Sequence, residues 1–413
     1  MSNHKVWFLW AGQTMANLGD IFYLVALISF LYRATDSALY TSMVPIVAVC
    51  GQLISGIAAP LLFDRLDLKR ILVISQSLKS VLLFVMTVYF QWFLGTAFVS
   101  YSFLFVFAIA LLDGVATPSR NALLPRLVDE LQLVKVNSLF SSTDQGVLFI
   151  GWAFGGVLVS FWSETNVLWA TCGLYIASSL FLLPLPEESE GSTESKESTS
   201  KWESIRAGWE HIWNQPSLRT VILSEVIDGL AGGVWISAIL LVYVKEALLQ
   251  GAEWWGFLNA SYFIGMILGG LIVYAIGNPI HSKAAISLTL STLLAAIFTW
   301  GFGYTSWTWL ALGLSVALGP VHQIQMITKQ TIVQRMSDPE MLAKVFSARG
   351  TLQYVGFGVS VVMMSTVTDQ LGVRFAYTFA ALLIVVQLVY LIIKRRFLHS
   401  DQAVHHESGD GTL

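Results

Sequence analysis

The sequence predicts an all-α integral membrane protein with about twelve transmembrane helices in two sets of six. Of its 413 residues, 55% are hydrophobic and 12% are charged, whereas a soluble domain carries about 25% charged residues. Twelve apolar runs approach or exceed the ~20 residues that a helix needs to cross a bilayer. One long polar stretch separates the first six runs from the last six. These observations disfavour a large soluble enzyme.

The first apolar run begins directly after Lys5 and is interrupted by Asn17 and Asp20. No small-residue cleavage site ends a short apolar core, so we expect a retained span rather than a signal peptide. Backbone polar groups must be satisfied internally in lipid, so each run is expected to be a helix. The twelve expected spans are 6–32, 41–63, 71–93, 98–117, 137–161, 166–185, 218–243, 254–277, 284–304, 307–328, 345–367 and 373–393.

The polar stretch at 186–201 reads PEESEGSTESKESTSK, a composition typical of a flexible linker. Tryptophan and isoleucine then recur at helical spacing from Trp202 to Trp213, which predicts an amphipathic helix ended by Pro216. This helix is expected either in the membrane interface or against the protein's own cytoplasmic face. The expected domains are a bundle at 1–185, a cytoplasmic linker with the amphipathic helix at 186–216, a second bundle at 217–397 and a disordered cytoplasmic tail at 398–413.

The distribution of Lys and Arg predicts the topology. With the N-terminus inside, nineteen of the 23 basic residues fall in cytoplasmic segments or at cytoplasmic span ends. Three remain outside, and Lys79 alone lies well within a span. Basic residues favour the cytoplasmic side, so we expect both termini and the linker to be cytoplasmic.

Several functional classes lack support in the sequence. Net charge is -3, which gives no indication of a nucleic-acid partner. Cys50 and Cys172 lie inside apolar runs and are interpreted as small apolar filler rather than a metal site. No phosphate-binding loop or nucleophile elbow is present, so we expect neither an ATP-driven pump nor an enzyme, and no cofactor.

Polar residues inside the spans are the candidate functional groups, because each ionised group at a span centre costs about 2.5–3.5 kcal/mol. Asp20 lies near the middle of the first span, and Gln13 and Asn17 share its helix face. This face predicts either a cavity lining with Asp20 as a proton or cation site, or a polar helix–helix contact.

Other spans carry further polar side chains. Lys79 is the basic residue well within a span, and its positive charge is able to neutralise one of the acidic side chains in the spans. A cavity with surplus carboxylates favours protons or organic cations, so proton coupling is a natural hypothesis. The remaining candidates are Asp113 in the fourth span, Asp144 and Gln145 in the fifth, Glu225 and Asp228 on one face of the seventh, and His322, Gln323 and Gln325 in the tenth, after a break expected at Gly319-Pro320.

Glycines four residues apart occur in two spans. Gly151 and Gly155 lie in the fifth span, and Gly265 and Gly269 lie in the eighth. Small residues at this spacing let helix backbones approach closely, so we expect tight helix contacts there.

The loop after the second span resembles the signature loop of the major facilitator superfamily, G-x-x-x-D-R-x-G-R-[RK]. Asp64, Arg65 and Lys69 match this pattern, and Arg70 adds one more base. The sequence departs from it at three positions, where Pro60 and Asp67 replace glycines and Leu68 replaces a basic residue.

The Asp-Arg-x-Asp variant resembles the branch that contains macrolide and enterobactin exporters. The opening helix from Leu9 to Asp20, the segments 118–128 and 137–138 and the segment 334–346 are similar to that branch as well, so the resemblance covers nearly the whole chain. It implies two pseudo-symmetric six-helix bundles, with helices one, four, seven and ten lining a central cavity.

The resemblance also suggests a cytoplasmic latch built on the Asp64 loop. Asp64 is expected to pair with Arg120 or with the positive N-terminus of the eleventh helix, which would favour the outward-facing state. Arg65 belongs to the same loop, whereas Lys69 and Arg70 serve either the latch or simply the topology.

We therefore expect a proton-coupled exporter of amphipathic small molecules, such as a drug, antibiotic or secreted metabolite, that works as a monomer in a bacterial cytoplasmic membrane. Its expected partners are a small-molecule substrate, protons and the lipid bilayer. The alternatives are an importer or flippase for a nutrient, peptide or lysophospholipid, and a transport-inactive membrane sensor.

Overall fold

The computed structural model describes residues 4–92, 98–186, 201–235, 237–251 and 253–398, and the regular elements in these ranges are all helices. Among them, eleven helices are long and apolar enough to cross a membrane, or twelve if one bent pair counts as a single span. The prediction of an all-α membrane protein with about twelve spans is confirmed. The expected flexible linker and disordered tail lie almost entirely outside the described residues.

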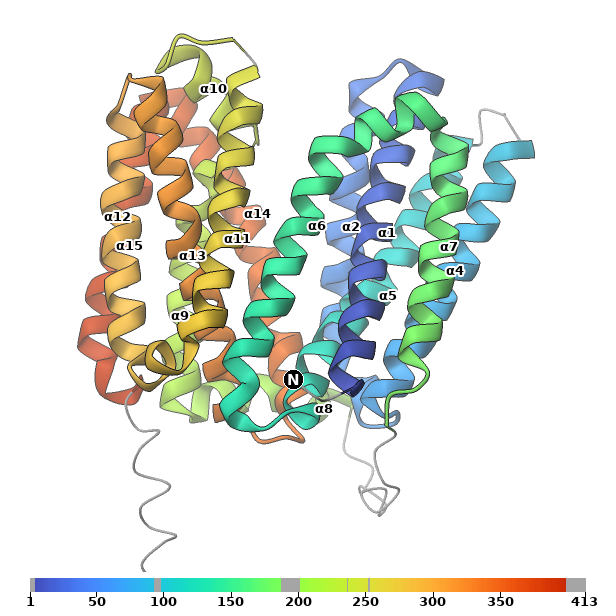
Figure 1. The fold of residues 1–413 in the computed structure, drawn as a ribbon, viewed down its shortest axis with the longest axis horizontal. Coiled ribbons are helices and arrows are strands. Elements are labelled where there is room, and N and C mark those ends of the chain that lie inside the picture. Colours follow the sequence, from blue (N-terminus) through green and yellow to red (C-terminus); the bar gives the residue numbers. More distant parts are fainter. Residues whose placement is uncertain (1–3, 93–97, 187–200, 236, 252, 399–413) are drawn as a thin grey trace, which may run out of the picture. The chain divides into compact units, whose positions relative to one another are not determined.

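The chain forms two compact units, which we describe separately. Unit 1 comprises residues 1–130, 146–211 and 338–351. Its transmembrane helices stand side by side in the half of Figure 1 drawn mainly in blue and green. The elements of this half of the chain are α1 (His4–Thr35), α2 (Ala38–Ala58), α3 (Pro60–Phe63), α4 (Leu68–Trp92), α5 (Phe98–Leu127), η1 (Glu130–Gln132), α6 (Leu133–Trp162), α7 (Glu164–Leu182) and α8 (Lys201–Asn214).

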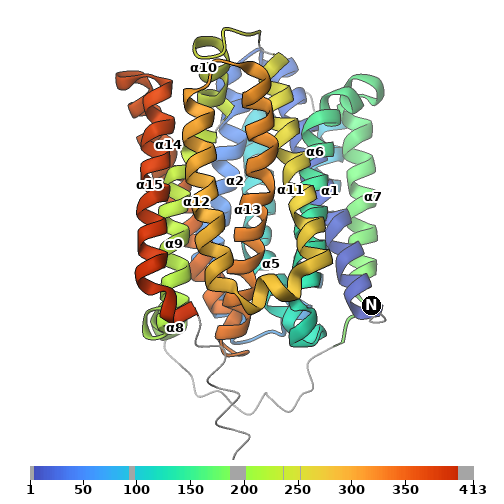
Figure 2. The same cartoon turned by 60° about the vertical axis from the view of Figure 1, so that its left-hand side comes forward.

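Unit 2 comprises residues 131–145, 212–337 and 352–413. Figure 2 shows α12, α13 and α15 at the front of this unit. The elements of this half of the chain are α9 (Pro216–Ala231), η3 (Gly232–Trp235), α10 (Ser237–Glu246), α11 (Glu253–Ser282), α12 (Ala284–Tyr304), α13 (Thr308–Met336), α14 (Leu342–Leu371), α15 (Val373–Lys394) and η4 (Arg395–Leu398).

The same helix pairs pack together in both units. In unit 1, α1 packs on α7, α2 on α5, and α4 on both α5 and α7. In unit 2, α9 packs on α15, α11 on α13, and α12 on both α13 and α15. Counted as transmembrane spans, the second set is the first set shifted by six. The two halves of the chain therefore repeat one packing scheme, as expected of an internal repeat.

The fifth and eleventh spans are exceptions that also match each other. The first turns of α6, residues 131–145, group with unit 2, and the rest of the helix groups with unit 1. Residues 338–351, which include the first turns of α14, group with unit 1, whereas the rest of α14 groups with unit 2. Each of these helices therefore carries the chain directly from one unit into the other.

Several expected boundaries were wrong. The fourth span was expected to end at residue 117, but α5 continues through Pro118 and Pro125 to Leu127. The break expected at Gly319-Pro320 is absent, because α13 runs through it to Met336. The seventh span is instead divided into α9 with η3 and α10, bent by 51°. Interior prolines are tolerated in transmembrane helices because neighbouring groups can satisfy the freed carbonyls.

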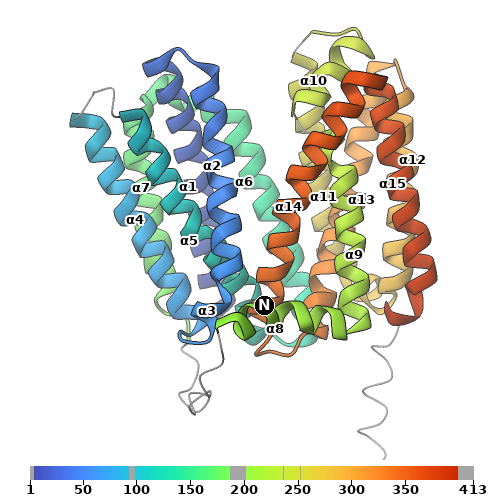
Figure 3. The same ribbon diagram turned by 180° about the vertical axis from the view of Figure 1, so that it is seen from behind.

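The amphipathic helix α8 ends at Asn214, just before Pro216, as predicted. Its buried face carries Ser204, Gly208 and Ile212, and the side chain of Trp202 is 78% exposed. A Cβ atom on Gly208 would overlap the Lys344 carbonyl group. Figure 3 shows α8 lying beside α3 at one end of the bundle helices. Of the two predicted positions, the structure favours packing against the protein itself.

Glycines allow the backbones of α11 and α13 to pack closely. A Cβ atom on Gly265 would overlap the carbonyl oxygen of Val316, and one on Gly319 would overlap the backbone of Gly265. Backbone cannot move aside as the end of a flexible side chain can. Gly151 and Gly155 likewise face Ile21 and Val25 of α1. The expectation of close packing at these glycines is confirmed, and in each case the contact lies within one unit.

We expect Gly265→Val to destabilise unit 2, because its side chain would force α11 away from α13 and overpacking costs about 1–3 kcal/mol. The thermal unfolding midpoint of the purified protein should fall by about 2–4 °C for each kcal/mol lost from unit 2. Gly256→Val on the same helix is the matched control, since no atom of the described residues lies within 4 Å of a Cβ there. Equal midpoints for the two variants would contradict this account of the contact.

Candidate functional site

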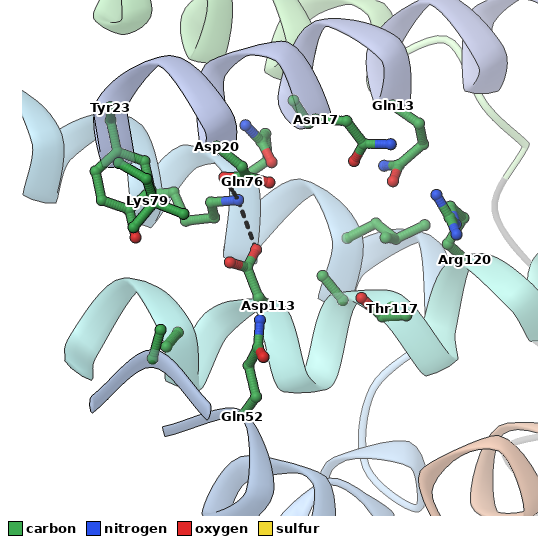
Figure 4. Close-up of a pocket in the computed structure, with 16 residues that line it drawn as sticks. Gln13, Asn17, Asp20, Tyr23, Gln52, Gln76, Lys79, Asp113, Thr117 and Arg120 are labelled. Atoms are coloured by element: carbon green, nitrogen blue, oxygen red, sulfur yellow. Dashed lines mark hydrogen bonds and ion pairs between the residues drawn. The ribbon is translucent and has the colours of Figure 1, made fainter. Parts of the chain in front are cut away.

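Unit 1 contains a cavity of about 170 Å³ between its helices. Figure 4 shows polar side chains from α1, α2, α4 and α5 turned toward this space. The lining residues are Gln13, Ala16, Asn17, Asp20, Tyr23, Leu24, Ala48, Gln52, Leu72, Gln76, Lys79, Ala110, Asp113, Ala116, Thr117 and Arg120. The face of Gln13, Asn17 and Asp20 identified in the sequence therefore lies on the cavity.

Three ionisable side chains from three helices meet at one end of the cavity. The Lys79 ammonium on α4 donates to Asp20 Oδ1 on α1 at 2.6 Å and to Asp113 Oδ1 on α5 at 2.5 Å. The Lys79 side chain is 2% exposed, whereas those of Asp20 and Asp113 are 26% and 20% exposed. The ammonium group is therefore largely enclosed, whereas the two carboxylates keep part of their surface open.

Tyr175 on α7 completes this group. Its hydroxyl donates to the same Asp20 oxygen that Lys79 contacts, and the Lys79 ammonium lies 4.8 Å from the centre of its ring. Gly19, next to Asp20, permits this approach, because a Cβ there would overlap the Tyr175 ring. A cation over an aromatic face is electrostatically favourable. Lys79 is thus held by two carboxylates and one ring.

Polar side chains continue along the cavity away from this group. Gln76 lies one helical turn from Lys79 and is 4% exposed, and its Nε2 atom has no hydrogen-bond partner among the described residues. Arg120 lies seven residues after Asp113 on α5, which corresponds to about 10 Å along a helix. Figure 4 shows Arg120 at the opposite end from Lys79. The cavity therefore has carboxylates at one end and a guanidinium at the other.

The candidates of the C-terminal half lie in unit 2. Lys329 on α13 donates to Asp228 on α9 at 3.0 Å, and the Tyr262 hydroxyl lies 2.9 Å from His322 Nδ1. Glu225 lies on α9, three residues before Asp228.

The remaining two candidates of this half are buried. Gln323 is fully buried and donates to Ser141 of α6, which makes it part of a helix–helix contact. Gln325 is 2% exposed, and neither polar atom of its side chain has a hydrogen-bond partner in the part of the chain that the structure describes.

Lys329 corrects the expectation that Lys79 is the one base well within a span. The tenth span was expected to end at residue 328, but α13 continues to Met336, and the Lys329 side chain is 3% exposed. The drop in hydropathy at 329–330 predicts a helix end that the structure does not have. The sequence signal that was missed is the acid–base complementarity of the seventh and tenth spans.

The Asp64 loop makes a second polar contact in unit 1. Asp64 Oδ1 accepts from the Lys344 ammonium in the first turn of α14 at 2.6 Å, and its other oxygen accepts from the Ser204 hydroxyl of α8. Of the two partners expected for Asp64, the observed contact is the one at the start of the eleventh helix, α14. Arg120 lines the cavity, and its Nε donates to Asn121. Because α5 stays helical past Pro118, Arg120 remains on the cavity side of that helix.

The other basic residues of this loop differ in pairing and exposure. Arg70 in the first turn of α4 pairs at 3.3 Å with Asp67, which lies just before that helix. Arg65 is exposed and Lys69 is half-buried.

A family model described as Major Facilitator Superfamily matches residues 9–277. The MFS-type transporter YfmI of Bacillus subtilis (strain 168) is 29% identical over 378 residues, covering 92% of this chain and 93% of the relative. Macrolide efflux protein A of Streptococcus pyogenes is 22% identical over 397 residues, covering 92% and 93%. The multidrug efflux pump Tap of Mycolicibacterium fortuitum is 23% identical over 378 residues, covering 89% of each chain.

Solved structures share the fold. The Escherichia coli fucose:proton symporter FucP superposes with a TM-score of 0.72 at 16% identity, covering 95% of this chain and 97% of that one. A bacterial homologue of the iron transporter ferroportin, in an outward-facing state, gives a TM-score of 0.73 at 13% identity, covering 95% and 99%. At such identities the likeness concerns the fold alone.

Proposed function

This chain belongs to the Major Facilitator Superfamily of transporters, and we propose that it exports amphipathic small molecules in exchange for protons. The observation that carries this proposal is the pair of carboxylates, Asp20 and Asp113, that share one lysine at the edge of a cavity. Intramembrane carboxylates of this kind are expensive to bury and typically mark ion or substrate paths. The likeness to a macrolide exporter and a multidrug pump supports the direction and the substrate class.

In the proposed cycle, substrate and proton compete for the same carboxylates. A proton that enters from outside neutralises the Asp20–Asp113 pair and releases a bound substrate outward, and loss of the proton to the cytoplasm restores the site. Alternating access of a site in such folds arises from the rocking of two bundles. The Asp64–Lys344 contact would act as the cytoplasmic latch in this cycle. We place the protein in the bacterial cytoplasmic membrane with both termini inside, as the distribution of basic residues indicates.

Inverted membrane vesicles with an imposed pH gradient test this function. We expect substrate accumulation that is driven by the gradient and collapses when a protonophore is added. The panel should contain hydrophobic cations, macrolides and small peptides, and vesicles without the protein are the control. If no member of the panel accumulates, the exporter proposal fails. Proton-driven movement in the opposite direction would identify an importer instead.

A further inference from the structure

The charges around the cavity do not cancel at its carboxylate end. Asp20 and Asp113 carry two negative charges when ionised, and Lys79 supplies one positive charge within 2.6 Å of both. The group of three therefore keeps one net negative charge. In a poorly solvated site, a charge left unpaired is costly, whereas a paired one is tolerated.

The exposure of the three side chains decides where a compensating charge can bind. Lys79 is buried, whereas the two carboxylates that line the cavity with it are partly exposed. A cation in the cavity can therefore contact both carboxylates while Lys79 stays in place. Such a cation would bring the local charge to zero, and so would a single proton.

We propose that Lys79 sets the charge of the cargo, so that the site binds molecules with one positive charge and exchanges each of them for one proton. This inference rests on the proposed function and narrows its substrate class. A dication would leave an excess positive charge beside Lys79, and a neutral molecule would leave the negative charge unpaired. Exchange of one monovalent cation for one proton moves no net charge across the membrane.

A second feature of the cavity points to a ligand independently. The buried Gln76 amide lines the cavity on the helix of Lys79, and its Nε2 donor has no partner within the described residues. A buried donor without a partner is costly, and a ligand with an acceptor group would recover that cost. A cargo with a hydrogen-bond acceptor close to its cationic centre should therefore bind more tightly than one with the cationic centre alone.

The other titratable groups around the site do not change this charge balance at neutral pH. Tyr23 on α1 and Tyr175 on α7 are neutral phenols. Arg120 on α5 is positive, but it lies about two helical turns from Asp113. The α2 residues that line the cavity, Ala48 and Gln52, do not titrate. The charge at the carboxylate end is thus decided by Asp20, Asp113 and Lys79.

Ethidium and propidium are suitable probes, because they share one ring system and carry one and two positive charges. We expect the purified full-length protein to bind ethidium about tenfold more tightly than propidium, a factor equivalent to roughly 1.4 kcal/mol. Lys79→Gln leaves two negative charges and should reverse this preference. Lys79→Arg keeps the positive charge and should retain it. Lys245→Gln, at an exposed lysine of α10, is the control and should bind both dyes as the wild type does.

Two further variants keep the test decisive if Lys79→Gln does not fold. Asp113→Asn leaves no net charge and should weaken ethidium binding about tenfold. The double variant Lys79→Gln with Asp113→Asn again leaves one negative charge and should recover the ethidium preference. If the ratio of ethidium affinity to propidium affinity is the same in all folded variants as in the wild type, the proposal is overturned. A wild type that binds neither dye would overturn it as well.

Transport separates this inference from the function on which it rests. In proteoliposomes, ethidium movement should follow the pH gradient and should change less than about twofold when a potassium diffusion potential is imposed with valinomycin. If pH-driven transport is absent while the wild type still prefers ethidium to propidium, the antiport function fails. The inference that Lys79 sets the charge of the cargo then stands. If transport is present but strongly sensitive to potential, the one-for-one exchange is wrong.

Discussion

Asp20→Asn is expected to abolish pH-driven transport. The substitution keeps the size of the side chain but leaves Lys79 and Asp113 as a neutral ion pair, so that no carboxylate remains unpaired to take up a proton. The Tyr175 hydroxyl retains an acceptor in the oxygen of the new side-chain amide, so the contact between α1 and α7 persists. We expect the initial rate in inverted vesicles to fall at least about 100-fold, which corresponds to loss of roughly 2.7 kcal/mol.

Asp36→Asn is the matched control for this prediction. Asp36 lies just after the end of α1, is exposed, and has a positive φ of 48°, a conformation that Asn also adopts readily. This variant should transport at the wild-type rate. Retained pH-driven transport by Asp20→Asn, at a similar amount of folded protein, would remove Asp20 from the coupling mechanism.

The membrane fold could be predicted from the sequence because lipid leaves few alternatives to a helix. Most apolar runs became one helix, whereas the second is divided into α2 and the short α3 and the seventh forms a bent pair. The span at 284–304 matches α12 at both ends. The resemblance of the Asp64 loop to the major facilitator superfamily is confirmed by the family match, and the exporter-like branch is supported by relatives at low identity. Hydropathy and one short loop therefore carried most of the fold prediction.

The inner ends of α5 and α13 could not be read from hydropathy. Both helices continue past the end of the hydrophobic run because Arg120 and Lys329 lie against other polar groups of the protein rather than in lipid. A hydropathy window averages over all faces of a helix, so it cannot register that one face lines a cavity or an ion pair. For the same reason hydropathy places Lys329 among the residues that set topology.

The pairing in the candidate site is a tertiary property. Lys79 lies 59 residues from Asp20 and 34 from Asp113 along the chain, and many other acids lie at similar separations. The sequence identified all three as polar groups in spans and noted that Lys79 could neutralise one acid. The sequence could not show that Lys79 contacts both Asp20 and Asp113. It also gave no reason to place Tyr175 and Gln76 beside them, because Tyr and Gln are not unusual in a transmembrane helix.

Asp64→Asn is expected to slow the transport cycle without changing substrate affinity. The Asp64 side chain is 21% exposed and that of Lys344 is 11% exposed, so this ion pair is better shielded than a typical surface pair. Its loss should cost about 1–2 kcal/mol in the state that contains the contact, which corresponds to roughly a tenfold lower maximal rate. Asp64 is not among the cavity-lining residues, so the substrate concentration at half-maximal rate should stay within about twofold.

The neighbouring Asp67→Asn variant is the control, because Asp67 belongs to the same loop but pairs with Arg70 at the start of α4, whose side chain is 50% exposed. It should keep the wild-type rate. A charge exchange, Asp64→Lys with Lys344→Asp, should recover part of the rate, since the pair is restored between the same two positions. An altered affinity with normal turnover in Asp64→Asn would contradict the latch. If Asp67→Asn slows transport equally, the effect belongs to the charge of the loop rather than to the contact with α14.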